Sequence, residues 1–511
     1  MASPSGSLPL PSPDEVVARS ARGAALTTVV GLLGRAAGLF TTLLVTHFVS
    51  KGDYGRANLA LIIATLANLV TLLSPQQALL TRHQRFSAAA RLVRGFAVWN
   101  GLLVAGLLLG GGGYLLGRLH EPTALPLLQV YALALVLERL SLVPALTLRY
   151  QLQFGALSRV DLGGDVAYVT VTVGAALLGA GAMCLPLGMV ARHLCGVGVL
   201  GGWYKTPLLP PRPGPLSADT RALLREILQY SWPIHLGGLG EFLTMYLDNV
   251  VVGQLYSAAA QGLYAVGYTL VMTPSETIAM YGATAMVRAL GLNDVATRQR
   301  TFLQGLRYVS LLLWPIGAGA ALVAGTLEVA LLPQSWRGIA GVVMGLGLGG
   351  AALGVSRMCF AQLTALHRTR AGGLMYAVQL AAFGLGLFLV ARLDPQRQHM
   401  PAVALAVSAA FTVPALLGLG LSIRADNLPG RGVLLALTPP LLGTAVMALA
   451  VWLLQRGLGA LGLAPSPLRL LVEITTGIAV YAAYLRLVHR ALWIEATSWL
   501  AQRRHQSAPT A

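Results

Sequence analysis

Long apolar stretches separated by short polar connections run along almost the whole chain. A helix needs about 20 mainly apolar residues to cross the hydrocarbon layer of a membrane, because each residue adds about 1.5 Å. Lipid offers no partner for backbone N–H and C=O groups, so each crossing segment is expected to be helical. We predict fourteen membrane-spanning helices, at residues 25–49, 57–75, 95–117, 124–146, 160–181, 183–203, 230–254, 262–285, 303–327, 338–362, 371–391, 401–423, 433–454 and 468–489.

A proline-rich connection divides these helices into two sets. Residues 204–229 begin with five prolines in nine positions and continue with an amphipathic pattern, which predicts a cytoplasmic linker followed by an interfacial helix. The turns around Gly55 and Gly262 resemble one another and indicate a weak internal repeat. Six helices in each copy is an even number, so the copies point the same way and are related by a pseudo-two-fold axis along the membrane normal.

The predicted fold class is therefore an all-α polytopic membrane protein, with two six-helix bundles and two extra C-terminal helices. We expect a polar cavity between the bundles. The predicted domains are a disordered cytoplasmic N-terminus (1–24), an N-terminal bundle (25–203), the linker (204–229), a C-terminal bundle (230–423), two additional helices (424–490) and a cytoplasmic amphipathic tail (491–511).

Composition and charge support this assignment. The chain is 56% hydrophobic and 11% charged, which leaves too little polar surface for a water-soluble domain. Its formal net charge of +18 invites a nucleic-acid partner. However, lysine and arginine concentrate in the connections that a cytoplasmic N-terminus places inside, as the positive-inside rule requires. We therefore expect both termini in the cytoplasm and no nucleic acid as a partner.

The three cysteines, Cys184, Cys195 and Cys359, lie in or beside predicted spans and lack metal-ligand spacing. They are expected to be small buried residues. The sequence predicts no metal site, no catalytic residues and no cofactor.

Arginines within the predicted spans are candidate ligands for an anionic substrate, because a charge at that depth is costly and usually serves a purpose. Arg35 lies mid-span between glycines and could bind a pyrophosphate or form an ion pair with Glu241. Arg139 is adjacent to Glu138, so the two side chains point about 100° apart on a helix and need separate partners. Arg357 lies near the middle of its span and is the third candidate.

Acidic residues in the spans are candidates for ion coupling or charge balance. Glu241 and Asp248 are two turns apart on one face of the seventh predicted span, where they could carry a proton or cation or pair with the arginines. Glu276 follows Pro274 in the eighth span and is a third candidate. Asp161 and Asp165 are interpreted as an interfacial pair, one turn apart.

Three stretches resemble the polysaccharide exporters of the Wzx type. They are GRAAGLFTTLLVTHFVSKGDYGRANLALIIATLANLVTLLSPQQALLTR at 34–82, LTLRYQLQFGALSRVDLGGDVAYV at 146–169, and LLREILQYSWPIHLGGLGEFLTMYLDNVVVGQLYSAAAQGLYAVGYTLVMTP at 223–274. The first two match an acidic-Tyr-Gly turn and an Arg/Phe-rich turn of that family, and the third matches its second-half opening. The superfamily also contains multidrug exporters and the peptidoglycan-precursor flippase.

The resemblance implies a flippase of the bacterial inner membrane that works by alternating access, not an enzyme. Its substrate would be an undecaprenyl-pyrophosphate-linked oligosaccharide for O-antigen, capsule or exopolysaccharide (lipopolysaccharide or other polysaccharide biosynthesis). Membrane lipid, a polysaccharide polymerase and glycosyltransferases would be its partners. One alternative is a multidrug or cation exporter on the same scaffold. Another is an integral-membrane polymerase or ligase, which the short outer loops and scattered acids disfavour.

Overall fold

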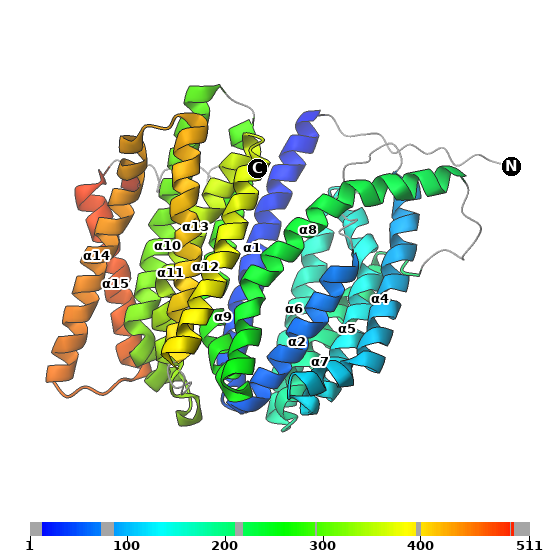
Figure 1. Ribbon diagram of the computed structural model, residues 1–511, viewed down its shortest axis with the longest axis horizontal. Helices are drawn as coiled ribbons and strands as arrows, with labels where there is room; N and C mark the ends of the chain where they lie inside the picture. The colour runs from blue at the N-terminus through cyan, green and yellow to red at the C-terminus, as the bar shows by residue number, and fades with distance from the viewer. Residues whose placement is uncertain are drawn as a thin grey trace, which may run out of the picture. The chain divides into compact units, whose positions relative to one another are not determined.

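The computed structural model describes residues 13–72, 86–209, 218–291, 294–394, 400–490 and 492–494. In these residues the chain is almost entirely helical and contains no strand, and each of the fourteen predicted spans overlaps an α-helix (Figure 1). The chain divides into two compact units, Met1–Val250 and Val251–Ala511. The boundaries of the predicted domains, including the six-helix bundles, stay predictions. The predicted tail lies almost wholly outside the described residues.

The described residues of unit 1 form six complete α-helices and most of a seventh. These are α1 (Pro13–Val45), α2 (Lys51–Leu72), α4 (Phe86–Arg118), α5 (Leu125–Tyr150), α6 (Phe154–Leu177), α7 (Cys184–Gly198) and α8 (Ala218–Leu255). Helix α6 packs between α1 and α7, and α5 contacts α2, α4 and α7. The predicted interfacial helix and seventh span form one continuous helix, α8, which is visibly curved (Figure 1).

Unit 2 contains α9 (Ala258–Gly291), α10 (Val295–Leu331), α11 (Ile339–Ala365), α12 (Thr369–Leu393), α13 (Met400–Asp426), α14 (Gly430–Ala460) and α15 (Pro467–Val488). Helix α11 is its centre and packs against α9, α10 and α13. Glycines permit this close packing: a Cβ atom on Gly347 would lie 2.6 Å from the carbonyl oxygen of Gly317 on α10. The backbones of α10 and α11 therefore cross in direct contact.

The last two helices extend unit 2 beyond this centre. Helix α14 packs against α10 and α15 (Figure 1). The three helices enclose a cavity of about 530 Å³ with an apolar lining that includes Leu311, Val323, Met447 and Ile478. Leucines such as Leu449 and Leu471 point outward from α14 and α15 and are exposed, as lipid-facing side chains are.

Eleven helices in the described residues are long and apolar enough to cross a membrane. The protein is thus a multi-pass membrane protein. Helices α2, α8 and α9 overlap predicted spans but do not reach the same apolar level, and they carry polar residues such as Asn68, Asp248 and Glu276. The prediction of fourteen crossings is supported for eleven helices, and it stays a prediction for these three.

Candidate functional site

Arg139 of α5 is a deeply buried charge in unit 1, with only 1% of the residue exposed. Its Nη2 donates to the backbone oxygen of Asn68 on α2, at 3.2 Å, and also to the side-chain Oδ1 of Asn68. Gly101 on α4 makes room for the arginine stem, because a Cβ there would lie 2.6 Å from the Cγ of Arg139. Arg139 therefore joins α5 to α2 across a glycine on α4.

Asn68 also holds the neighbouring carboxylate. Its Nδ2 donates to Oε2 of Glu138 at 3.3 Å, while its Oδ1 accepts from Arg139. One neutral amide thus connects two opposite charges that point in different directions from α5. The sequence predicted that Glu138 and Arg139 need separate contacts, but it did not identify Asn68. The sequence feature that could have identified Asn68 is its position as a polar residue within an apolar span, where such residues usually bind a partner. We call Asn68, Glu138 and Arg139 the amide bridge.

Other polar atoms around the amide bridge have no partner among the described residues. Nε and Nη1 of Arg139 are buried without an acceptor. On α4, Asn100 donates through Nδ2 to the backbone oxygen of Thr71 at 3.0 Å, but its Oδ1 is buried without a donor. A buried polar atom without a hydrogen-bond partner is unfavourable. These atoms of α4 and α5 are therefore available to form hydrogen bonds with water or with a polar group of a ligand.

A polar cavity of about 360 Å³ lies beside the amide bridge, between α5, α6 and α7. Glu138 forms part of its wall, together with Arg149, Asp161, Arg192 and His193. The cavity thus has charges of both signs on its walls, which suits a hydrated or charged group rather than a hydrocarbon chain.

One side of this cavity is fixed by an ion pair. Arg192 Nη1 on α7 lies 2.8 Å from Asp165 Oδ1 on α6, and the Asp165 carboxylate lies directly against Gly34 on α1. The pair therefore links α1, α6 and α7. The sequence interpreted Asp161 and Asp165 as an interfacial pair, whereas the structure gives Asp165 a partner on another helix and places Asp161 at the cavity.

The candidate Asp248 lies in α8 and is 1% exposed. Its Oδ1 accepts from the backbone N of Asn249 at 2.8 Å and from Asn249 Nδ2 at 3.0 Å. The side-chain oxygen of Asn249 accepts from Asn58 on α2 at 3.3 Å. Two asparagines of α2 therefore make polar contacts with other helices, Asn58 with α8 and Asn68 with α5.

Arg35 is half-buried on α1, next to the position where Gly34 contacts Asp165. No hydrogen bond or ion pair joins Arg35 to another residue in the described part of the chain. Glu241 lies in α8, but its side chain is outside the described residues. The ion pair between Arg35 and Glu241 remains a hypothesis, as does the substrate-binding role of Arg35.

The remaining candidates belong to unit 2. Arg357 is half-buried on α11. Glu276 on α9 accepts a hydrogen bond from the hydroxyl of Tyr268, eight residues earlier on the same helix, at 3.0 Å. Of the predicted site residues only Arg139 belongs to the amide bridge. Arg357 and Glu276 lie on separate helices of unit 2.

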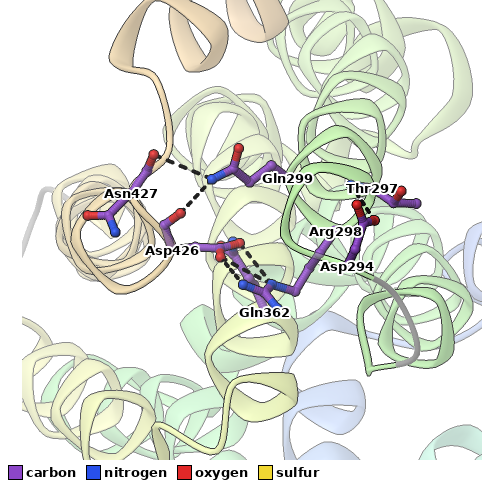
Figure 2. Close-up of polar contacts among 7 residues, drawn as sticks. All are labelled: Asp294, Thr297, Arg298, Gln299, Gln362, Asp426 and Asn427. Carbon is purple, nitrogen blue, oxygen red and sulfur yellow. Dashed lines mark hydrogen bonds and ion pairs between the residues drawn. The ribbon is translucent and has the colours of Figure 1, made fainter.

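Unit 2 also contains a polar cluster that the sequence did not predict (Figure 2). Asp426, at the end of α13, forms an ion pair with Arg298 of α10 and accepts from Gln362 Nε2 of α11 at 3.1 Å. Gln299 donates to the backbone oxygen of Asp426 at 2.7 Å. Three helices are thereby tied together where α10 begins and where α11 and α13 end.

Beside this cluster, Asp294 caps the first turn of α10. Its Oδ1 accepts from the backbone N of Thr297 at 3.1 Å (Figure 2). Hydrogen bonds from the Thr297 side chain and backbone lower the pKa of the Asp294 carboxyl. Among the described residues no group of three histidines, cysteines or acids could hold a metal ion.

Comparison with known proteins identifies the family. The sequence profile described as "Polysaccharide biosynthesis protein" matches residues 44–341, more than half of the chain. The chain belongs to this family. A search of curated proteins gives no significant match to this polysaccharide biosynthesis protein.

Solved structures show the same fold. The lipid II flippase MurJ, in an inward closed conformation, is similar with a TM-score of 0.69 and 14% identity over 92% of this chain and 99% of that chain. An inward-facing multidrug resistance MATE family transporter of the MOP superfamily is similar with a TM-score of 0.61 and 13% identity, over 78% of this chain and 98% of that chain. For the Vibrio cholerae MATE transporter VcmN in the bent form, the TM-score is 0.50 and the identity 13%, over 82% of this chain and 99% of that chain.

At such identities, similarity of structure establishes the fold alone. This polysaccharide biosynthesis protein has the fold of MOP-superfamily transporters, and the predicted all-α polytopic fold class is confirmed. This fold agrees with the prediction of a transporter rather than an enzyme.

Proposed function

We propose that this polysaccharide biosynthesis protein is a flippase for undecaprenyl-pyrophosphate-linked oligosaccharides in the bacterial inner membrane, with both termini in the cytoplasm. The observation that carries the proposal is the amide bridge, in which a buried guanidinium keeps two nitrogens, Nε and Nη1, without an acceptor among the described residues. A pyrophosphate offers oxygen acceptors that match a guanidinium fork. The polar cavity beside Glu138 has room for a hydrated sugar or phosphate group.

The structural likeness to the lipid II flippase MurJ supports a lipid-linked substrate. In this proposal the sugar head passes through a polar path while the lipid tail stays in the bilayer, and no covalent bond changes. Arg35, Arg139 and Arg357 contact the pyrophosphate during the cycle. Glu241, Asp248 and Glu276 balance charge or couple an ion. A polysaccharide polymerase and glycosyltransferases act on the same lipid-linked substrate before and after transport.

The amide bridge gives Arg139 a defined part in this cycle. In the present conformation its Nη2 is occupied by Asn68 of α2, and its aliphatic stem lies against Gly101 of α4. Separation of α2 from α5 frees Nη2 and uncovers the other two donors. The pyrophosphate then replaces Asn68 as the partner of Arg139, so that substrate binding compensates for the broken contact.

The test uses purified protein in vesicles that contain a fluorescent undecaprenyl-pyrophosphate oligosaccharide. Sugar that reaches the far leaflet is detected by a membrane-impermeant quencher. We expect transport by the unaltered protein and a loss of at least about tenfold for Arg139→Ala, since one charge-assisted hydrogen bond contributes about 1.5–3 kcal/mol. Arg118→Ala, at the exposed far end of α4, is the matched control. Equal transport by vesicles without the protein would refute the proposal.

A multidrug exporter is the second candidate, because a MATE family transporter shares the fold with a TM-score of 0.61. Efflux of a cationic dye from the same vesicles, with no movement of the oligosaccharide, would favour it. The positively charged candidates in the spans support the anionic substrate instead. Formation of longer glycan products would indicate a polymerase.

A further inference from the structure

A second polar cavity in unit 1 lies where α4 begins and α5 ends. Its volume is about 400 Å³, and its lining includes Ser87, Arg91 and Arg94 of α4, Thr147 and Tyr150 of α5, and Thr206. The rings of Phe86 and Tyr150 are stacked 3.7 Å apart and form one wall. This cavity is separate from the one beside the amide bridge, and the proposed transport path does not use it.

Two arginines face this cavity without a counter-ion. Arg91 and Arg94 are one turn apart on α4 and repel one another. Neither has a hydrogen bond or ion pair with another described residue, and Nε of Arg94 is buried without an acceptor. Arg91 is exposed and Arg94 is half-buried, so water reaches this pair. An anion that bridges the two guanidiniums would replace their mutual repulsion by attraction.

The helix geometry adds to the positive potential. Helix α4 begins at Phe86, so its first turn presents backbone N–H groups that have no partner within the helix. A helix N-terminus carries a partial positive charge and favours phosphate groups. The hydroxyl-bearing residues Ser87 and Thr206 supply further polar groups to the lining.

The cavity lies at the depth of the lipid headgroups according to the predicted spans. The third span is predicted to begin at residue 95, directly after Arg94, and the fourth to end at residue 146. We propose that Arg91 and Arg94 form a binding site for a phosphate group, either of an anionic phospholipid or of free phosphate. A phosphate matches the site better than a carboxylate, because it offers more acceptor oxygens to two guanidinium forks.

The site is independent of the transported substrate, so it can be tested without a transport assay. The purified full chain in detergent is titrated in one arm with short-chain phosphatidylglycerol and in the other with inorganic phosphate at constant ionic strength. Native mass spectrometry and the melting temperature report binding, because a ligand that binds the folded state stabilises it. Phosphatidylcholine is the lipid control.

We expect binding in at least one arm. Each arginine removed should weaken it about tenfold, so Arg91→Ala/Arg94→Ala should weaken it about 100-fold. Arg118→Ala removes an arginine from the other end of α4 and should leave binding unchanged. Binding of the lipid alone identifies a headgroup, binding of phosphate alone identifies a soluble anion, and binding of both shows that the phosphate group suffices. No binding in either arm, or equal binding by the double variant, would overturn the proposal.

A second measurement needs no variant and therefore does not depend on how the double variant folds. The unaltered protein is treated with an arginine-specific dicarbonyl reagent, with and without the anion that binds, and the modified residues are identified by mass spectrometry. Bound phosphate should slow the modification of Arg91 and Arg94 at least about tenfold while Arg118 reacts as before. Equal modification of all three arginines would contradict the assignment.

Discussion

Unit 1 has a partly open cavity between α5, α6 and α7, unit 2 has one between α10, α14 and α15, and the linings of these two cavities are opposite in character. The walls in unit 1 carry Glu138, Asp161, Arg192 and other ionisable side chains. The lining in unit 2 is apolar apart from a few groups such as Glu473, whose carboxylate already accepts from Thr326, Gln455 and Arg469. Charges that are fully bonded hold helices together, whereas charges on the wall of a cavity remain available to a ligand.

Helix α11 of unit 2 and helix α2 of unit 1 also differ in the polarity of their contacts with neighbouring helices. The centre of unit 2 is α11, whose contacts with α10 and α13 are made mostly by glycines and apolar residues, with polar contacts at Gln362 and from Ser408. Helix α2 of unit 1 instead meets its neighbours through Asn58 and Asn68. Apolar contacts favour a fixed arrangement, while polar contacts can exchange one partner for another. We therefore expect unit 1 to supply more of the ligand chemistry, and the following predictions test this contrast.

The largest effect is expected for Arg139→Met, which leaves Glu138 without its bridged counter-charge inside unit 1. Removal of one member of a buried charge pair costs about 3–5 kcal/mol of unfolding free energy. The double variant Glu138→Gln/Arg139→Met should recover a large part of this loss, because no buried charge then lacks a counter-charge. Thermal unfolding in detergent measures both. If the single variant is as stable as the unaltered protein, the amide bridge is not a buried charge pair.

In unit 2, Asp426→Ala should lower the unfolding free energy by about 2–3 kcal/mol, because Arg298 and Gln362 lose a charged acceptor. The comparison is Asp53→Ala, which removes a more exposed pair with Arg56 at 3.0 Å and should cost less than about 1 kcal/mol. Melting temperatures of the two variants provide the measurement. Equal losses would show that burial does not strengthen the Asp426 cluster.

Gly347→Ala should destabilise unit 2 by about 1–2 kcal/mol, because the new methyl group meets the backbone of α10. Gly384→Ala on α12 has open space around it and should be neutral or stabilising, since alanine is the better helix former. Both variants are compared by thermal unfolding in the same detergent. A destabilised Gly384→Ala with an unaffected Gly347→Ala would contradict the close crossing of α10 and α11.

The smallest effect concerns pH. Because the pKa of Asp294 is lowered in the folded protein, its contribution to stability is present above the unfolded pKa and is lost as the pH falls through the folded pKa. The first turn of α10 should therefore open more readily in acid. Asp294→Asn keeps the cap and should remove this pH dependence. Hydrogen exchange at Thr297, corrected for intrinsic rates, reports the change, and an unaltered pH profile in Asp294→Asn would refute the assignment.

The helices were predictable because hydropathy along the chain depends only on which residues follow one another. Their rotations were not, because helices that are apolar on most sides give no periodic signal for the side that faces a neighbour. This is why Asn68 was missed as the partner of Glu138 and Arg139, and why Asp165 was not matched with Arg192. The pairing depends on contacts between α2 and α5 and between α6 and α7, which one sequence does not specify.

An amide has a donor end and an acceptor end, so the bridge at Asn68 has a direction. Half a turn about its last side-chain bond exchanges the two ends without moving the backbone. The backbone oxygen of Asn68, which also accepts from Arg139, does not turn with the amide. A protein with Glu138→Arg and Arg139→Glu together would therefore regain the two side-chain contacts but set the new carboxylate against this carbonyl oxygen. The backbone of α2 thus fixes the polarity of the bridge, although its side chain alone does not.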